Sequence, residues 1–440
     1  MRKKNLLISC FPIFATLFFL LSCVISTKTF STPSFTASET PPAKNSTQAE
    51  ASPELWYLTR GGSKLDQGWG VDTDSEGNLY FATFQQSEKD PFADIVVYKF
   101  SPDGKEIWHA RWGGKNMEKA FIVTVKEPSV YVGGLTYTSA VSLTEADMAL
   151  LAFNAQDGSL AWDFTWGQGY GYEEVDGLVV GDDAIYLSGW TTGKTTGNDV
   201  AVLKLDLKGK LIWVKSWGGK SWDEGDGQMV VDKDTIYVAG RYNGTNIILG
   251  GEGLIVRFSK QTGEYISHIT WGGPLGTDAL GMTSDGTFLY AVGLTVDKGN
   301  GGQIFLRKYD KSLNLIWEEL WGVKGSESAR AVAVGPSGDI FVAGSSDSFS
   351  NGGGLDVAFL RYTPDGILVW AKTWGGKLSD GASGLAIFGN RAFIAGTTKS
   401  YGNGQDDALL ISADTETGQF PSIPEQMIPM PFETGGSAEK

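Results

Sequence analysis

The chain has 440 residues, with 36 Lys and Arg against 51 Asp and Glu, and a formal net charge of −15 at pH 7. A surface this acidic repels nucleic-acid phosphates and attracts cations and basic partners, so we expect no nucleic-acid partner. The 2 Cys and 2 His argue against a metal centre built from thiolates or several imidazoles, and we expect neither a metal nor a cofactor.

The first 22 residues have the layout of a secretory signal. Three basic residues at positions 2–4 precede an apolar run at 6–21, and the run ends in LLSC, whose cysteine is Cys23. The LLSC sequence resembles the cleavage box of bacterial lipoproteins. That resemblance implies cleavage before Cys23, lipidation of its thiol, and a membrane anchor that faces the periplasm or the cell exterior. An ordinary signal cut at another position is the alternative.

Two further segments lack the apolar content of a folded core. Residues 23–53 are rich in Ser, Thr, Pro and Ala, which predicts a flexible tether. Residues 419–440 form a Pro-rich tail for which we also expect a loose structure.

Residues 54–418 consist of a repeat. A Trp-Gly landmark recurs every 50 to 54 residues, at the positions listed next. They are Trp112, Trp166, Trp217, Trp271, Trp321 and Trp374, with a degenerate copy at Arg60. A period near fifty predicts repeat architecture.

Each repeat contains four short runs of β-branched and aromatic residues, separated by Gly, Asp and Asn turns, as in RAVAV, DIFVAG, DVAFLRY and LVWAKTW. Such runs predict antiparallel strands, and four strands per fifty residues predict a blade of a β-propeller. A linear β-solenoid is the rival architecture, but its coils are usually shorter and its ends need caps.

The two ends of the repeat region are incomplete in complementary ways. The last unit, 374–418, has three strands, whereas ELWYLTRGG at 54–62 has the spelling of a fourth strand with no unit before it. Joining them completes a seventh blade and protects the strand edges at both termini. The sequence therefore predicts an all-β fold, a seven-bladed propeller closed by its N-terminal strand.

The repeat units, such as ARAVAVGPSGDIFVAGSSDS followed by DVAFLRYTPDGILVWAKTWGG, resemble the SBBP-type β-propeller repeats of exported bacterial and archaeal proteins. The resemblance covers residues 55–418. It implies the propeller fold and says little about activity, since one fold hosts many functions.

Two sets of recurring residues are expected to serve the blades. Twelve of the 15 Trp occur in fourth strands, mostly in pairs four residues apart, and we expect them to fill the wedges between blades. A carboxylate also follows each landmark by six or seven residues, at one mouth of the central channel. These acids are Asp66, Glu118, Glu173, Asp223, Asp278, Glu327 and Asp380. They form either a cation-attracting ring or, as sevenfold recurrence favours, structural acceptors of backbone N–H groups.

Residues that depart from the repeat are better candidates for function. Trp190 and Trp222 are two of the three Trp outside the fourth strands (the third is Trp69), and Tyr170 and Tyr172 occur in the loop before the third blade. We expect these four aromatics on the loop-rich face, where acids interleave with them. They are candidates for a site that stacks against a sugar or peptide, although packing of the loops is the alternative.

The sequence gives little support to catalysis. His109 and His268 occur in fourth strands without a nucleophile motif, which argues against a Ser-His-Asp triad. A single DTETG turn only faintly resembles the quinoprotein repeat, and no loop has the spacing of a strong calcium motif.

The functional prediction is a non-catalytic binding or scaffold module, monomeric and lipid-anchored, with a protein or polysaccharide partner on the loop-rich face. A carbohydrate-active enzyme that uses carboxylates on that face is the alternative.

Overall fold

A computed structural model describes residues 54–87, 92–139, 144–193, 197–244, 250–272, 275–297, 301–323, 325–350 and 353–422. The predicted signal segment 1–22, the tether 23–53 with its Cys23, and the tail beyond residue 422 lie outside the described residues. Among the residues described, none forms a helix with the length and apolar character needed to cross a bilayer.

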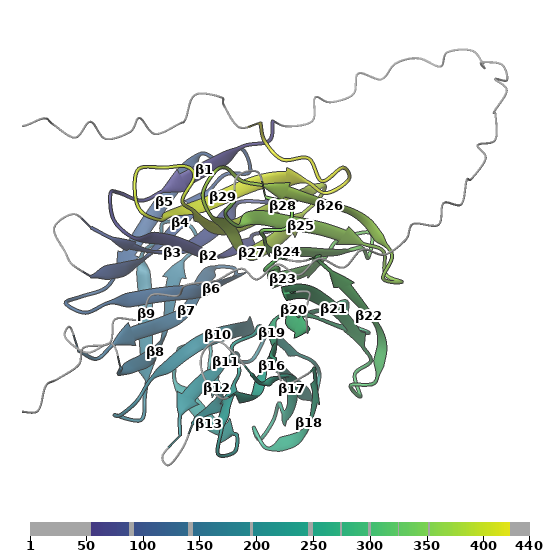
Figure 1. Ribbon diagram of the computed structural model, residues 1–440. Helices are drawn as coiled ribbons and strands as arrows, with labels where there is room; N and C mark the ends of the chain where they lie inside the picture. The colour runs from purple at the N-terminus through teal and green to yellow at the C-terminus, as the bar shows by residue number, and fades with distance from the viewer. Residues whose placement is uncertain are drawn as a thin grey trace, which may run out of the picture. The chain divides into compact units, whose positions relative to one another are not determined.

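The described residues form seven antiparallel sheets arranged as propeller blades (Figure 1). The innermost strands, in blade order, are β2 (Asp66–Thr73), β6 (Glu118–Lys126), β10 (Glu173–Val180), the divided β14 (Trp222–Glu224) and β15 (Met229–Val231), β19 (Thr277–Ser284), β23 (Ser328–Val334) and β27 (Asp380–Phe388). The second strands are β3 (Leu79–Gln86), β7 (Ser129–Tyr137), β11 (Ile185–Thr192), β16 (Thr235–Gly244), β20 (Leu289–Asp297), β24 (Ile340–Ser346) and β28 (Arg391–Thr398). The third strands are β4 (Ala93–Phe100), β8 (Ala146–Asn154), β12 (Asn198–Leu205), β17 (Glu252–Ser259), β21 (Gly301–Tyr309), β25 (Asp356–Tyr362) and β29 (Asp407–Asp414). The outermost strands are β5 (Glu106–Trp112), β9 (Leu160–Trp166), β13 (Leu211–Trp217), β18 (Tyr265–Trp271), β22 (Leu315–Trp321), β26 (Leu368–Trp374) and β1 (Tyr57–Arg60).

The seven-bladed propeller predicted from the repeat is confirmed. The seventh blade has the order β27-β28-β29-β1, so the N-terminal strand is its outermost strand. Tyr57 lies opposite Ile411 in the register of β1 with β29, and the N–H of Ser412 donates to the carbonyl of Trp56 at 2.8 Å. The purple and yellow ends of the described chain therefore lie side by side (Figure 1).

The hydrophobic core is divided among the junctions between blades. Each main cluster of buried apolar side chains combines residues of two neighbouring blades; Phe81 of β3, for example, shares a cluster with Phe393 of β28 and Leu410 of β29. Trp56 and Leu58, at the N-terminal strand, pack against that same cluster. Closing the ring thus buries apolar surface as well as pairing strand edges.

The fourth-strand tryptophans lock neighbouring blades together. The first Trp of an outermost strand lies against the turn before the next blade's outermost strand, at a glycine with positive φ. A Cβ on Gly209 would lie 2.7 Å from the ring of Trp162, and one on Gly158 would lie 2.7 Å from Trp108. These turns therefore need glycine for space as well as for φ.

The junction between blades four and five lacks this pair of a tryptophan and a glycine. Ser267 of β18 stands where other outermost strands have their first Trp, and Leu313 stands in the facing turn where the others have glycine. Leu313 is 5% exposed and has a φ of 70°. The buried leucine fills space that a tryptophan occupies at the other junctions.

Candidate functional site

The site lies on the propeller axis, because the innermost strands share a local irregularity. Their pairing with the second strands shifts register by one residue at the same place in each blade, and β14 and β15 are separated there. The residues at this bulge position are Trp69, Phe121, Asp176, Asp226, Leu280, Arg330 and Ser383. All except Asp176 line cavities among the innermost strands. Bulges commonly aim a side chain into a site in this way.

These bulge residues make the channel asymmetric. Trp69 and Phe121 of blades one and two meet edge to face with ring centroids 5.1 Å apart. The guanidinium of Arg330, from blade six, lies 5.3 Å from the Trp69 ring centroid. Blades three to five carry smaller or acidic side chains at this position, and a cavity of about 870 Å³ opens on their side. Its lining includes loop residues such as Thr144 and Leu275, which place it on the loop-rich face.

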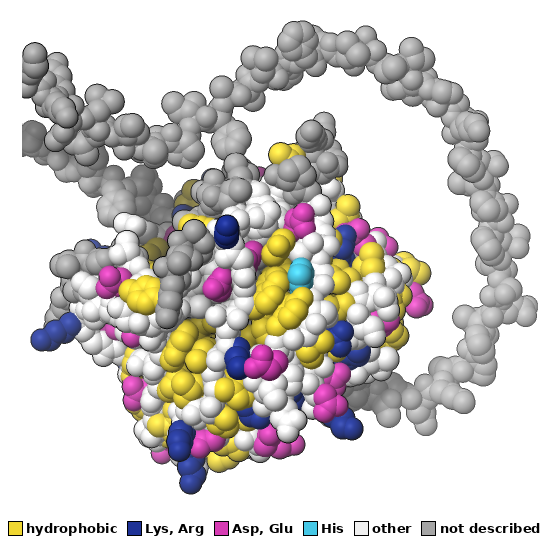
Figure 2. Space-filling model, turned by 90° about the horizontal axis from the view of Figure 1, so that it is seen from below, with side chains coloured by type: hydrophobic (Ala, Val, Ile, Leu, Met, Phe, Trp, Pro, Cys, Tyr) yellow, Lys and Arg dark blue, Asp and Glu magenta, His cyan; other side chains and the backbone are white. Residues whose placement is uncertain are grey.

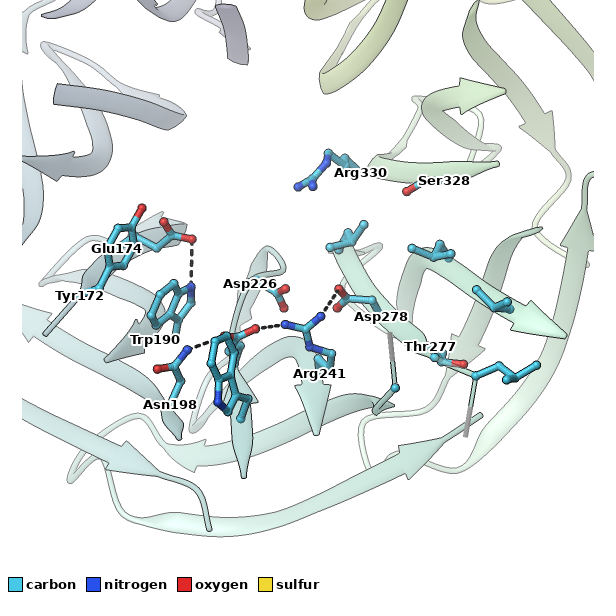
Figure 3. A pocket seen from close by; sticks show the side chains of 18 of the residues that line it. Tyr172, Glu174, Trp190, Asn198, Asp226, Arg241, Thr277, Asp278, Ser328 and Arg330 are labelled. Carbon is cyan, nitrogen blue, oxygen red and sulfur yellow. Dashed lines mark hydrogen bonds and ion pairs between the residues drawn. The ribbon is translucent and has the colours of Figure 1, made fainter. Parts of the chain in front are cut away.

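One wall of the cavity is aromatic. The rings of Tyr172 and Trp190 are stacked, with centroids 4.8 Å apart and planes 12° from parallel. The Trp190 Nε1–H donates to Glu174 Oε1 at 2.9 Å, which fixes the indole against the acid (Figure 3). Trp222 also lines the cavity. Rings held in this way form a rigid surface against which a ligand can stack.

A chain of polar side chains crosses the floor of the cavity (Figure 3). Asn198 Nδ2 donates to Glu224 Oε1 at 2.5 Å, and the Arg241 guanidinium hydrogen-bonds the same carboxylate. Arg241 also lies 3.8 Å from Asp278 Oδ2. Glu224 and Arg241 are 4% and 8% exposed, so this pair is a buried ion pair that holds the acids of blades four and five in place.

Burial is the largest cause of the shifted pKa values of four acids around the cavity. It raises the pKa of Glu174, Asp176, Asp226 and Asp278, and repulsion between neighbouring carboxylates adds to the effect for each of them. Arg241 and Arg330 oppose the rise in pKa at Asp226 and Asp278. The cavity therefore contains more carboxyl groups than guanidinium groups, and burial and mutual repulsion both disfavour negative charge on these carboxyl groups.

The structure brings together three of the four predicted aromatics. Tyr172, Trp190 and Trp222 line the cavity, in agreement with their predicted place on the loop-rich face. Tyr170 lies outside the lining, where it is 38% exposed and its hydroxyl donates to Gln168 Oε1 at 2.8 Å.

The predicted ring of acids is less uniform than its spacing suggested. Asp66, Glu118, Glu173, Asp223, Glu327 and Asp380 are buried at the start of the innermost strands. Two backbone N–H groups donate to Asp223, those of Gly219 at 2.6 Å and Asn243 at 2.8 Å. In blade five Thr277 occupies the equivalent position, and Asp278, one residue on, lies on the opposite face of its strand and lines the cavity. The one-residue offset matters because successive strand residues face opposite ways.

The buried ring acids face acids of the neighbouring blade's third strand. Burial raises the pKa of Glu118 and of Glu173 to about 7, and the charges of Asp94 and Asp147, respectively, contribute to the rise. Asp147 has a pKa raised by burial as well. At these junctions two carboxyl groups share a buried space, which favours keeping a proton on one of them.

Arg241, Arg330 and Asn198 were not among the site residues predicted from the sequence. The bulge position carried a signal for Arg330. When the innermost strands are aligned, Arg330 falls at the same position as Asp176 and Asp226, and the residue type there differs among all blades except the two that carry Asp. Arg241 and Asn198 had no such signal, because their role depends on contacts between strands β14, β16 and β12. Within the described residues, no group of three or more His, Cys, Asp and Glu side chains is placed to hold a metal ion.

Fold and site together define a seven-bladed β-propeller with an acidic, aromatic-walled cavity at one channel mouth. No family model matches the chain, and no curated protein matches its sequence.

Similar folds occur among solved structures. The WD40 β-propeller domain of Doa1 aligns with a TM-score of 0.50 at 12% identity, covering 81% of this chain and 97% of that one. The β-propeller domain of the trilobed protease from Pyrococcus furiosus aligns with a TM-score of 0.47 at 9% identity, covering 82% and 99%. At such low identities the likeness to the Doa1 domain shows the propeller fold alone, and the other structure carries no argument.

Proposed function

We propose that this chain is an exported β-propeller of the SBBP-repeat type that binds a protein or polysaccharide partner through the channel mouth on its loop-rich face. The observation that carries the proposal is the cavity of about 870 Å³, with Trp190 and Trp222 in its wall and buried polar groups at its floor. Cavities of this size with a few fixed polar groups are the usual place for ligands.

The binding role has a direct test in ligand arrays. The purified full-length chain and a Trp190→Ala/Trp222→Ala double variant are applied to glycan and peptide arrays. We expect the signals of the natural chain to be lost in the double variant, because both stacking surfaces are removed. The variant Phe388→Ala, which truncates an exposed aromatic on the opposite face, serves as the matched control. Array signals that survive in the double variant would refute binding at the cavity.

The membrane attachment forms a separate part of the proposal. A signal that ends in LLSC, followed by a Ser-, Thr- and Pro-rich segment, supports lipidation at Cys23 and a tether that holds the propeller away from the membrane. Metabolic labelling with a fatty acid tests this: label is expected on the natural chain and on Cys10→Ser, and not on Cys23→Ser. Equal labelling of both variants would contradict the anchor.

A second function, hydrolysis of a glycosidic bond, is favoured by one observation. The cavity holds carboxyl groups in two different environments, Asp226 with a pKa raised by burial and Glu224 paired with Arg241. Glycoside hydrolysis commonly uses two carboxyl groups whose environments differ in this way. Turnover of a panel of aryl glycosides, abolished by Asp226→Asn and retained by Asp182→Asn on the opposite face, would support the enzyme over the binding module.

A further inference from the structure

The charge of the cavity selects among the ligands that the proposed function allows. Its lining contributes four carboxyl groups, from Glu174, Glu224, Asp226 and Asp278, against the guanidinium groups of Arg241 and Arg330. The carboxyl groups of the lining therefore outnumber its guanidinium groups by two, and Asp176, on which the charges of Glu174 and Asp226 act, adds a further acid. A ligand that enters this space is favoured if it carries positive charge.

Three acids at the cavity, including Asp278 whose Oδ2 lies near Arg241, each have one oxygen with unused hydrogen-bonding capacity. Among the described residues, no N–H or O–H group donates to Asp176 Oδ2, Asp226 Oδ1 or Asp278 Oδ1, although all three oxygens are shielded from solvent. The charge of Asp278 raises the pKa of Asp226, and the charge of Asp226 raises that of Asp176, so the three acids act on one another. An ammonium group placed between them would supply the missing donors as well as the missing charge.

The side wall of the cavity differs from its floor. Leu275, Leu280, Leu294 and Val296 contribute aliphatic groups to the lining from blade five, whereas the stacked pair Tyr172 and Trp190 comes from blade three. A sugar ring carries hydroxyl groups around its edge, and these would lose their hydrogen bonds against such a wall. The aliphatic stem of a lysine or arginine side chain instead packs on apolar surface while its charged end reaches the acids.

We propose, as an extension of the proposed binding function, that the channel mouth receives a lysine or arginine side chain of a basic peptide segment, with its cationic end between Asp226 and Asp278. Arg330 lies across the open space from these acids (Figure 3). Because it is exposed and carries the same charge as the ligand, it weakens binding rather than assisting it. The neutral Trp69 ring holds it to one side of the channel.

The test uses the full-length chain and a blocked pentapeptide with one lysine between glycines. Matched peptides carry norleucine or N-acetyl-lysine in place of the lysine. Binding is followed by calorimetry. We expect the lysine peptide to bind on the order of tenfold more tightly than either neutral peptide, because only the ammonium pairs with the acids. Equal affinity for the three peptides, or no binding of the lysine peptide at millimolar concentration, overturns the inference.

Two substitutions with opposite expected effects on binding make the test more specific. Asp226→Asn removes one acid and is expected to weaken lysine-peptide binding about tenfold. Arg330→Met removes the like charge, keeps a side chain that packs on Trp69, and is expected to strengthen binding several-fold. Asp182→Asn changes the net charge of the protein as Asp226→Asn does, but at an exposed turn, and should leave binding unchanged. The reverse pattern, weaker binding by Arg330→Met and stronger by Asp226→Asn, would show an anion site.

The outcome also separates this inference from the binding function on which it rests. If a neutral oligosaccharide, or an oligomer of glucosamine, bound the channel mouth while the lysine peptide did not, the cationic peptide would be excluded and the binding module would stand. If array ligands bound but were insensitive to Trp190→Ala/Trp222→Ala, the proposed function itself would fail.

Discussion

At the scale of single residues, the propeller is held together by pairs formed across blade junctions. A tryptophan ring on one blade lies against a glycine turn of the next, and where Ser267 replaces the tryptophan, Leu313 replaces the glycine. The leucine accepts a φ of 70°, a conformation that costs an L-residue about 1–2 kcal/mol. Filling the junction therefore outweighs the backbone cost.

The ring contact at these turns can be measured apart from the backbone strain. We expect Gly209→Ala to lower the free energy of unfolding by roughly 2–4 kcal/mol, because its Cβ would lie 2.7 Å from the Trp162 ring at a φ of 83°. Gly389→Ala is the matched control: its φ is 58° and no other atom lies within 4 Å of the added Cβ. It should cost only about 1 kcal/mol in denaturant unfolding. Equal losses for the two variants would contradict the Trp–Gly contact.

The buried acid at a blade junction predicts a pH effect. Burial raises the pKa of Glu173 to about 7 in the folded state, above its usual 4.5. The folded protein therefore holds this proton more tightly than the unfolded chain, and stability falls as pH rises from about 4.5 to 7.

The variant Glu173→Gln removes this titration while keeping an oxygen for the Thr191 hydroxyl, which donates to Glu173 at 2.9 Å. We expect the variant to match the natural chain at pH 4.5 and to exceed it by about 1–3 kcal/mol at pH 8. The measurement is urea unfolding across this range. A difference between the two proteins that does not change with pH would show that Glu173 remains ionised in the fold.

Comparison of the repeat with itself predicted where three of the four aromatic candidates lie, and their role in binding stays a prediction. The aromatic departures Tyr172, Trp190 and Trp222 lie in one cavity, because residues that break a structural repeat are released from its packing role. Arg241 could not be predicted in the same way. Its position depends on strand register and on two acids from other strands, and neither contact is visible in the spacing of residues.

At the scale of elements, each outermost strand contributes side chains both to the packed junctions between blades and to the outer surface. Figure 2, seen from the side where β13 and β18 lie in Figure 1, shows hydrophobic side chains gathered over the outer surface. In β13 the neighbours Ile212 and Trp213 face opposite ways: Ile212 is 53% exposed, whereas Trp213 packs into the junction between blades three and four. Alternation along a strand explains the difference.

This alternation gives a prediction for adjacent residues. Ile212→Lys is expected to change the free energy of unfolding by no more than about 0.5 kcal/mol and to improve solubility, because it places charge on an open strand edge. Trp213→Ala, one residue later, should cost roughly 2–4 kcal/mol because it empties the wedge against Gly263. Thermal and denaturant unfolding of both variants checks this, and a large loss for Ile212→Lys would mean that the β13 edge is covered.

At the scale of the whole molecule, the fold was predictable because its signals repeat seven times. The strand runs, the turns and the incomplete end units all indicated a closed ring of seven blades. The cavity was less predictable because it arises where the repeat fails. Trp69 and Phe121 occupy one side of the channel, while Asp226, Leu280 and Arg330 line the larger cavity on the other side. Only the register of the innermost strands shows which side chains reach the axis.

Closure of the ring fixes the axis, and with it the cavity that the proposed function needs. The most direct measurement is a disulfide cross-link in a chain whose two native cysteines are replaced by serine. Thr59 and Leu409 are opposite each other in β1 and β29, at a pair without mutual backbone hydrogen bonds, where Cα atoms approach to about 4.5 Å. Cysteines at both positions should form a disulfide on mild oxidation, detected by mass spectrometry of the digested protein. Leu58→Cys with Leu409→Cys, one residue out of register, should not. A cross-link that fails for the first pair, or forms equally in both, would contradict the closed seven-bladed ring.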